Sequence, residues 1–222
     1  MTAATAGPIL AAGWRRIAAV TLGFILAYHA TLAAVLVIRF GHLPNYATLY
    51  DWPANIARIL RSTPSVRDAL PIVLDEWLLE LGYMDPAYGH GIAVWSLAVL
   101  PAKLLLVALT GVLVGANAVL LRAVPCPAVG RYAVGLGSGA GAGLAGLASA
   151  SVTWVVCCGT PSWAITLSML GVDISTALWL QPLGPWLQAA GFALLLLGLG
   201  TLWRRAAVSS GPALLGLEPE TP

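Results

Sequence analysis

The chain has 222 residues, of which 59% are hydrophobic and only 9% are charged. A water-soluble domain carries about 25% charged residues, so this composition excludes an ordinary soluble globule and predicts an integral membrane protein. The formal net charge of +2 is too small to indicate binding to nucleic acid.

The first predicted span follows a basic pair, Arg15 and Arg16. An apolar run from Ile17 to Ile38 is long enough to cross a hydrocarbon core of about 30 Å. The apolar region of a secretion signal is shorter, at about 7–15 residues, so we expect a retained anchor.

Most of the acidic residues lie in a polar segment from Gly41 to His90: Asp51, Asp68, Asp75, Glu76, Glu80 and Asp85. Asp51 and Ser65 each precede a helical pattern and are predicted to cap it. The second pattern continues as an apolar stripe to Leu81, which is typical of a helix on the membrane surface. We expect the acids to form a solvated face rather than a site.

Three further spans are predicted. The second lies between Ile92 and Leu121, with Lys103 reaching the outer interface; the third runs from Arg131 to Cys157; the last runs from Gly184 to Trp203. In the third, glycines repeat every four residues, which in lipid favours close packing with another helix; these are Gly135, Gly139 and Gly143, with Gly137 and Gly141 beside them. The tail after Ser209 is predicted to be disordered.

The arginines flank the ends of the spans: Arg15, Arg16, Arg122, Arg131, Arg204 and Arg205. If the positive ends are cytoplasmic, both termini lie inside and Gly41–His90 lies outside. Asp173 would be costly at mid-bilayer, so Ser162–Gln181 is predicted to be a broken or re-entrant element. A fifth span, with the C-terminus outside, is the alternative.

The predicted fold is therefore an all-α integral membrane protein of the bacterial inner membrane, with four transmembrane helices, the re-entrant element and periplasmic surface helices. Residues 1–130 form a two-span region with the outer loop 41–90. Residues 131–208 form a second region, and 209–222 the tail.

Two adjacent cysteines, Cys157 and Cys158, stand in this apolar setting just before Gly159 and Pro161. Proline and glycine loosen a helix, and freed backbone at membrane depth is tolerated only around a cavity or packed protein. Thiolates select soft metals such as Cu(I) and, by the same softness, Hg(II). The chain has no C-x-x-C or H-E-x-x-H, so a zinc enzyme or a thioredoxin-like protein is not expected. Simple apolar packing of the cysteines is the alternative.

Residues from about 135 to 205 resemble the mercuric-ion transport proteins of bacterial mercury-resistance operons. The resemblance rests on a small-residue helix, Cys-Cys-x-x-Pro, a Leu-Gly-Val stretch, a Pro-x-x-Pro turn and a basic end: here Cys157, Cys158 and Pro161, Leu170–Val172, Pro182 and Pro185, and Arg204 and Arg205. It implies that Cys157 and Cys158 take a soft metal from the periplasmic side.

The chain departs from that family in two ways. The first 130 residues have no counterpart in it, and many members carry a second cysteine pair on the cytoplasmic side. This chain has only Cys126 there, between two prolines. Cys126 is either a ligand that releases the metal to the cytoplasm or an incidental loop residue.

The predicted function is an inner-membrane carrier or binding protein for Hg(II) or Cu(I), with the bilayer around it and no other certain cofactor. The alternative is an accessory subunit of a larger membrane complex, or a homo-oligomer, assembled through the glycine-rich face. A membrane enzyme is a third possibility, but His29, Lys103 and Asp173 assemble into no mechanism, so we do not expect an enzyme. His29 is predicted to hydrogen-bond within the protein or to bind a cofactor.

Overall fold

The structure is a computed structural model that describes residues 6–88, 93–123, 128–148, 153–154 and 173–209. Three of its helices are long and apolar enough to cross a membrane: α2 (Trp14–Phe40), α5 (Pro101–Ala123) and α9 (Gly184–Ser209). The mostly helical fold and the membrane class expected from composition are therefore confirmed.

A fourth long helix, α6 (Ala128–Ala148), has 21 residues, but its many glycines lower its hydropathy and it does not join the three candidate spans. The predicted number of four spans stays a prediction. The expected end of the third span at Cys157 is wrong, because α6 ends at Ala148 and residues Thr153–Trp154 form strand β4.

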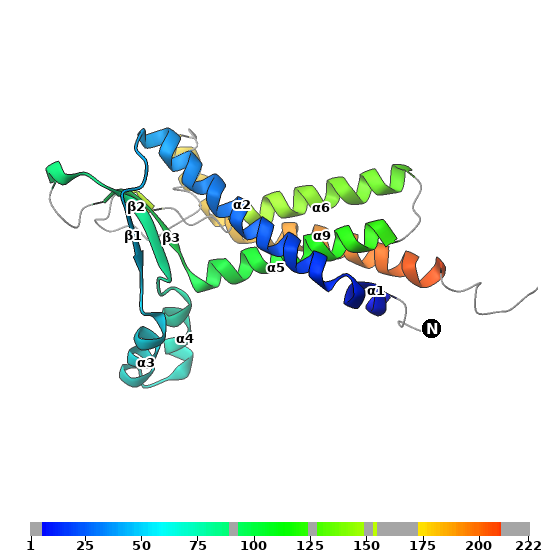
Figure 1. The fold of residues 1–222 in the computed structure, drawn as a ribbon, viewed down its shortest axis with the longest axis horizontal. Coiled ribbons are helices and arrows are strands. Elements are labelled where there is room, and N and C mark those ends of the chain that lie inside the picture. The colour runs from blue at the N-terminus through cyan, green and yellow to red at the C-terminus, as the bar shows by residue number, and fades with distance from the viewer. Residues whose placement is uncertain (1–5, 89–92, 124–127, 149–152, 155–172, 210–222) are drawn as a thin grey trace, which may run out of the picture. The chain divides into compact units, whose positions relative to one another are not determined.

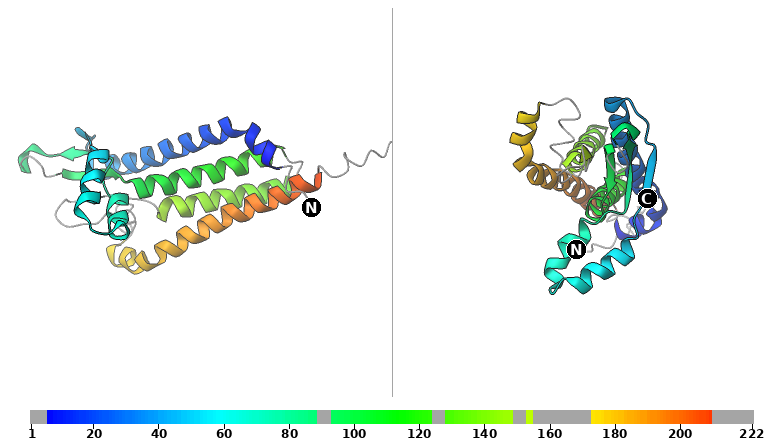
Figure 2. Two further views of the ribbon diagram at one scale, coloured as in Figure 1. Left: turned by 90° about the horizontal axis from the view of Figure 1, so that it is seen from below. Right: turned by 90° about the vertical axis from the view of Figure 1, so that its left-hand side faces the viewer.

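The chain forms two compact units, each assembled from segments distant in sequence. We call them the helical unit (1–24, 108–145 and 189–222) and the sheet unit (25–107 and 146–188). The helical unit contains the short helix α1 (Ala6–Ala12) and parts of α2, α5, α6 and α9, which run alongside one another (Figures 1 and 2).

Glycines bring α2 and α5 into close antiparallel contact in the helical unit. A Cβ atom added at Gly111 would lie 2.9 Å from the Thr21 Cα, and one added at Gly115 would lie 3.1 Å from the Ile17 Cα. Side chains at these two positions would force the backbones apart, which is the mode of packing that small residues permit between membrane helices.

A second close crossing joins α6 to α9. A Cβ added at Gly141 would lie 2.7 Å from the Gly191 carbonyl oxygen, and one added at Gly191 would lie 2.7 Å from the Gly141 oxygen. The glycine-rich helix therefore does pack closely on another helix, but through Gly141 beside the predicted stripe and not through the stripe itself. Among the described residues, no heavy atom lies within 4 Å of a Cβ added at the predicted stripe of Gly135, Gly139 and Gly143, or at Gly137.

An apolar cluster lies where α1 meets the C-terminal parts of α5 and α9. Leu120, Leu202 and Ala206 are buried at its centre and partly buried side chains pack around them: Ile9, Leu10, Leu121, Val134, Leu199 and Trp203. Helix α1 thus covers the ends of α5 and α9.

The sheet unit contains a four-stranded antiparallel sheet in the order β1 (Tyr46–Leu49), β2 (Leu79–Met84), β3 (Ala93–Val99), β4. The all-α expectation is wrong here, and so is a second span starting at Ile92. A short apolar run is ambiguous between strand and buried helix. Pro101 resolves the ambiguity, because it is suited to a helix N-terminus and α5 begins at that residue.

Two short helices, α3 (Trp52–Ser62) and α4 (Val66–Leu74), precede β2. Both predicted caps are confirmed: the Asp51 side chain accepts from the Ala54 N–H and the Ser65 side chain accepts from the Arg67 N–H. The apolar stripe expected to continue as helix to Leu81 is wrong beyond Leu74, because Leu79–Met84 pairs as a strand on both sides.

The second half of α2 packs against the sheet within the sheet unit. Leu36, Trp95 and Leu97 are buried together, and partly buried side chains surround them: Leu32, Ala33, Val37, Phe40, Tyr83 and Val94. This core fixes the sheet on the end of α2.

Candidate functional site

The three predicted metal ligands, Cys126, Cys157 and Cys158, lie outside the described residues. The structure does describe how the chain approaches the cysteine pair. In β4, Thr153 pairs with Ser96 and Trp154 pairs with Trp95. The expectation that a helix runs from Arg131 to Cys157 is therefore wrong at Thr153–Trp154, the last described residues before the cysteine pair.

Within the described ranges, no three His, Cys, Asp or Glu side chains are grouped closely enough to hold a metal ion. The predicted metal ligands are not among the residues to which this finding applies, so their role stays a prediction.

His29, predicted as a cofactor ligand or a hydrogen-bonded residue, is part-buried on α2. Its Nδ1 lies 2.8 Å from the Ile25 carbonyl oxygen one turn earlier, so Nδ1 donates the hydrogen bond. The ring packs edge-on against Tyr28, with 5.1 Å between centroids. The imidazole thus has a backbone partner in its own helix, and its binding of a cofactor stays a prediction.

The other two groups considered for catalysis lie at helix starts. Lys103 is in the first turn of α5. Asp173 is exposed, and its carboxylate accepts hydrogen bonds from the Ser175 N–H and hydroxyl at the start of α8 (Ile174–Leu180). The carboxylate thus serves as a helix cap.

The sheet unit holds a buried carboxylate, Glu80, which is 8% exposed. Tyr46 Oη donates to its Oε1 at 2.8 Å and Tyr50 Oη donates to its Oε2 at 2.7 Å. The Ser96 side chain is hydrogen-bonded to Tyr46 in turn. We call Ser96, Tyr46, Glu80 and Tyr50 the tyrosine clamp.

Burial and the Glu80 carboxylate both act on the two phenols. Burial, followed by the hydrogen bond to Glu80, raises the pKa of Tyr46 well above its ordinary value. The same two causes raise the pKa of Tyr50 to about 12. Both phenols therefore stay protonated near neutral pH and keep donating to the carboxylate.

Gly82 makes the clamp sterically feasible. A Cβ at this position would lie 2.5 Å from the Trp95 carbonyl oxygen and 2.7 Å from Tyr46 Oη. The Tyr46 side chain therefore passes directly over Gly82, where a larger residue would collide with it. The clamp joins β1 to β2 through hard oxygen atoms, which do not suit a soft metal.

Sequence reasoning placed Glu80 on a solvated face, and this is wrong. The signal that could have revealed it is the alternation in "LELGYM", which puts Glu80 and Gly82 on one face of a strand. The acid is tolerated inside because two phenols satisfy it.

A second polar group lies in the helical unit. Asn117 Nδ2 donates to the Leu113 and Leu195 carbonyl oxygens at 2.8 and 3.1 Å and so joins α5 to α9. A Cβ at Gly198 would lie 2.9 Å from Asn117 Oδ1 and 3.6 Å from Ser138 Oγ, so both atoms approach this glycine. These are again hard oxygen groups.

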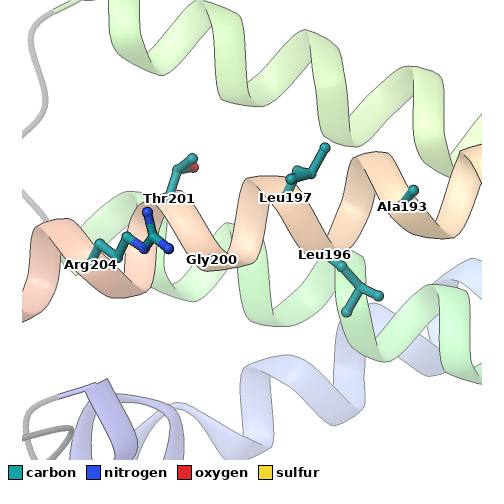
Figure 3. Close-up of a pocket in the computed structure, with 6 residues that line it drawn as sticks. All are labelled: Ala193, Leu196, Leu197, Gly200, Thr201 and Arg204. Carbon is teal, nitrogen blue, oxygen red and sulfur yellow. The ribbon is translucent and has the colours of Figure 1, made fainter.

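The surface of α9 carries an open apolar hollow of about 470 Å³ (Figure 3). It is lined along one helix and has a single charge at its end: Ala193, Leu196, Leu197, Gly200, Thr201 and Arg204. Among the described residues, the lining is thus apolar apart from the Thr201 hydroxyl and the Arg204 guanidinium.

Comparison with protein-family models, with characterised proteins and with solved structures finds no match for this chain. The resemblance to mercuric-ion transport proteins therefore stays a prediction that rests on the residues quoted for it.

Proposed function

We propose that the protein is a multi-span protein of the bacterial inner membrane that binds a soft metal ion, Hg(II) or Cu(I), through Cys157 and Cys158. Adjacent thiols supply the ligand softness that these ions prefer. The observation that carries the proposal is the adjacent pair of thiols directly before Gly159 and Pro161 in an apolar part of the sequence.

The proposed topology has four spans: α2, α5, α6 and α9. The distribution of charge supports it. The sheet unit has no pair of adjacent arginines, whereas α2 and α9 each have one. The sheet unit contains seven acids: Asp51, Asp68, Asp75, Glu76, Glu80, Asp85 and Asp173. The helical unit has six arginines near helix ends: Arg15, Arg16, Arg122, Arg131, Arg204 and Arg205. Positive ends inside the cell leave the sheet on the periplasmic side.

The test is a titration of the purified full-length protein with Hg(II) and with Cu(I), with bound metal counted by elemental analysis. We expect one ion per chain, and loss of that ion in the Cys157→Ser/Cys158→Ser variant, because serine offers a hard oxygen in nearly the same volume. Cys126→Ser is the matched control and should keep the ion. If the double variant binds as much metal as the parent, the proposal fails.

A second candidate function, an accessory subunit, is supported by the open glycines of α6. In the part of the chain that the structure describes, no heavy atom lies within 4 Å of a Cβ added at Gly135, Gly139 or Gly143. A helix from another subunit would find a close-packing face there. Gly139→Leu should then disrupt a complex purified in mild detergent, whereas Gly23→Leu, an equally open position on α2, should not. Equal behaviour of the two variants would exclude docking at this face.

A further inference from the structure

A hollow of about 210 Å³ lies between α2 and α5 in the helical unit. Arg16 and Arg122 line it together with small and apolar residues: Ala19, Val20, Gly115, Ala118 and Val119. Two cations from two helices therefore share one depression whose remaining wall is apolar.

The antiparallel packing makes the two arginines converge. The Gly13–Val119 and Gly115–Ile17 contacts fix the register of the two helices. Side chains on a helix incline toward its N-terminus. Arg16 therefore inclines toward Gly13, which contacts Val119. Arg122 inclines toward Val119 along its own helix, so both side chains approach the level of Val119.

No carboxylate in the described part of the helical unit can neutralise this pair. The acids nearest in sequence, Asp51 and Asp85, belong to the sheet unit, and the only acids assigned to the helical unit are Glu218 and Glu220 in the tail, outside the described residues. Two like charges beside one hollow repel each other, and an anion between them removes that repulsion.

We propose that this hollow binds an anionic phospholipid. The two guanidinium groups hold the phosphate, because guanidinium matches phosphate geometry through paired N–H donors. An acyl chain follows the apolar wall formed by Val20 and Ala118. Basic pockets between membrane helices are suited to such headgroups. The site is independent of the cysteine pair.

The experiment counts lipids retained by the full-length protein in neutral detergent, using native mass spectrometry with phosphatidylglycerol and, separately, phosphatidylcholine. The parent should retain one phosphatidylglycerol in preference to phosphatidylcholine. Arg16→Gln/Arg122→Gln should weaken phosphatidylglycerol binding about thirtyfold, as expected for two basic contacts. Arg15→Gln and Arg205→Gln are matched controls that do not line the hollow and should change nothing.

Two more variants test the shape of the hollow and the role of the acidic tail. Ala118→Leu fills the hollow while keeping both charges, and should weaken binding about fivefold with an unchanged thermal midpoint. Glu218→Gln/Glu220→Gln should leave binding unchanged; a rise in affinity would mean that the tail carboxylates occupy the hollow, and would overturn the proposal.

Glycerol 1-phosphate tests whether the phosphate alone is recognised. It should fail to displace phosphatidylglycerol at equal concentration, because it lacks the acyl chain. Displacement would mean that the hollow binds a soluble phosphate. Equal losses of phosphatidylglycerol binding in Arg15→Gln and in Arg16→Gln would mean that the lipid is held by general positive charge and not by this hollow. Either result refutes the lipid site.

Discussion

The crossing of α6 and α9 at Gly141 and Gly191 gives a sharp test of how the helical unit is held together. In Gly141→Ala the new Cβ would lie 2.7 Å from the Gly191 carbonyl oxygen. An ordinary carbon–oxygen contact between helices is about 3.3 Å, so the helices must separate by about 0.6 Å. Such overpacking costs about 1–3 kcal/mol.

A control is needed because alanine is also the better helix former, by about 1 kcal/mol relative to glycine. Gly139→Ala lies two residues away in the same helix, and a Cβ there meets nothing within 4 Å. The difference between the two variants removes the propensity effect. We therefore expect Gly141→Ala to be less stable than Gly139→Ala by about 1–3 kcal/mol.

The assay is equilibrium unfolding of the full-length protein in mixed micelles, followed by circular dichroism as a denaturing detergent is added. Gly191→Ala should behave like Gly141→Ala, because its Cβ would lie 2.7 Å from the Gly141 oxygen. If Gly141→Ala proves as stable as Gly139→Ala, close contact at these two glycines does not hold α6 against α9.

Three further predictions concern the sheet unit, all measured by unfolding of the full-length chain followed by tryptophan fluorescence. Glu80→Ala leaves two part-buried phenols without their acceptor and should cost about 1–3 kcal/mol, whereas Glu80→Gln keeps one acceptor oxygen and should cost less; the reverse order would contradict the clamp. Gly82→Ala should cost about 1–3 kcal/mol, because its Cβ would meet the Trp95 carbonyl oxygen at 2.5 Å, and a neutral result would refute that contact. Because the pKa of Tyr50 is raised from 10.0 to about 12, its contribution is complete below pH 10 and is lost as the pH rises toward about 12; Tyr50→Phe should flatten this window, and an unchanged profile would exclude Tyr50 as its cause.

The long helices could be predicted because their signal is local. An apolar run such as that from Ile17 to Ile38 has one stable form in lipid, a helix, and Asp51 and Ser65 mark helix starts through their own side-chain hydrogen bonds. These features depend on residues a few positions apart, so the sequence alone contains them.

Much of the sheet could not be predicted in the same way, because β1 and β4 are far along the chain from the strands with which they pair. Strand β3 pairs with β2 and with β4, more than fifty residues later. Without its partner strands, Ala93–Val99 is an apolar run directly before another apolar run. The sequence pattern therefore assigns both runs to one predicted helix. Burial of Glu80 likewise depends on Tyr46 and Tyr50, some thirty residues earlier.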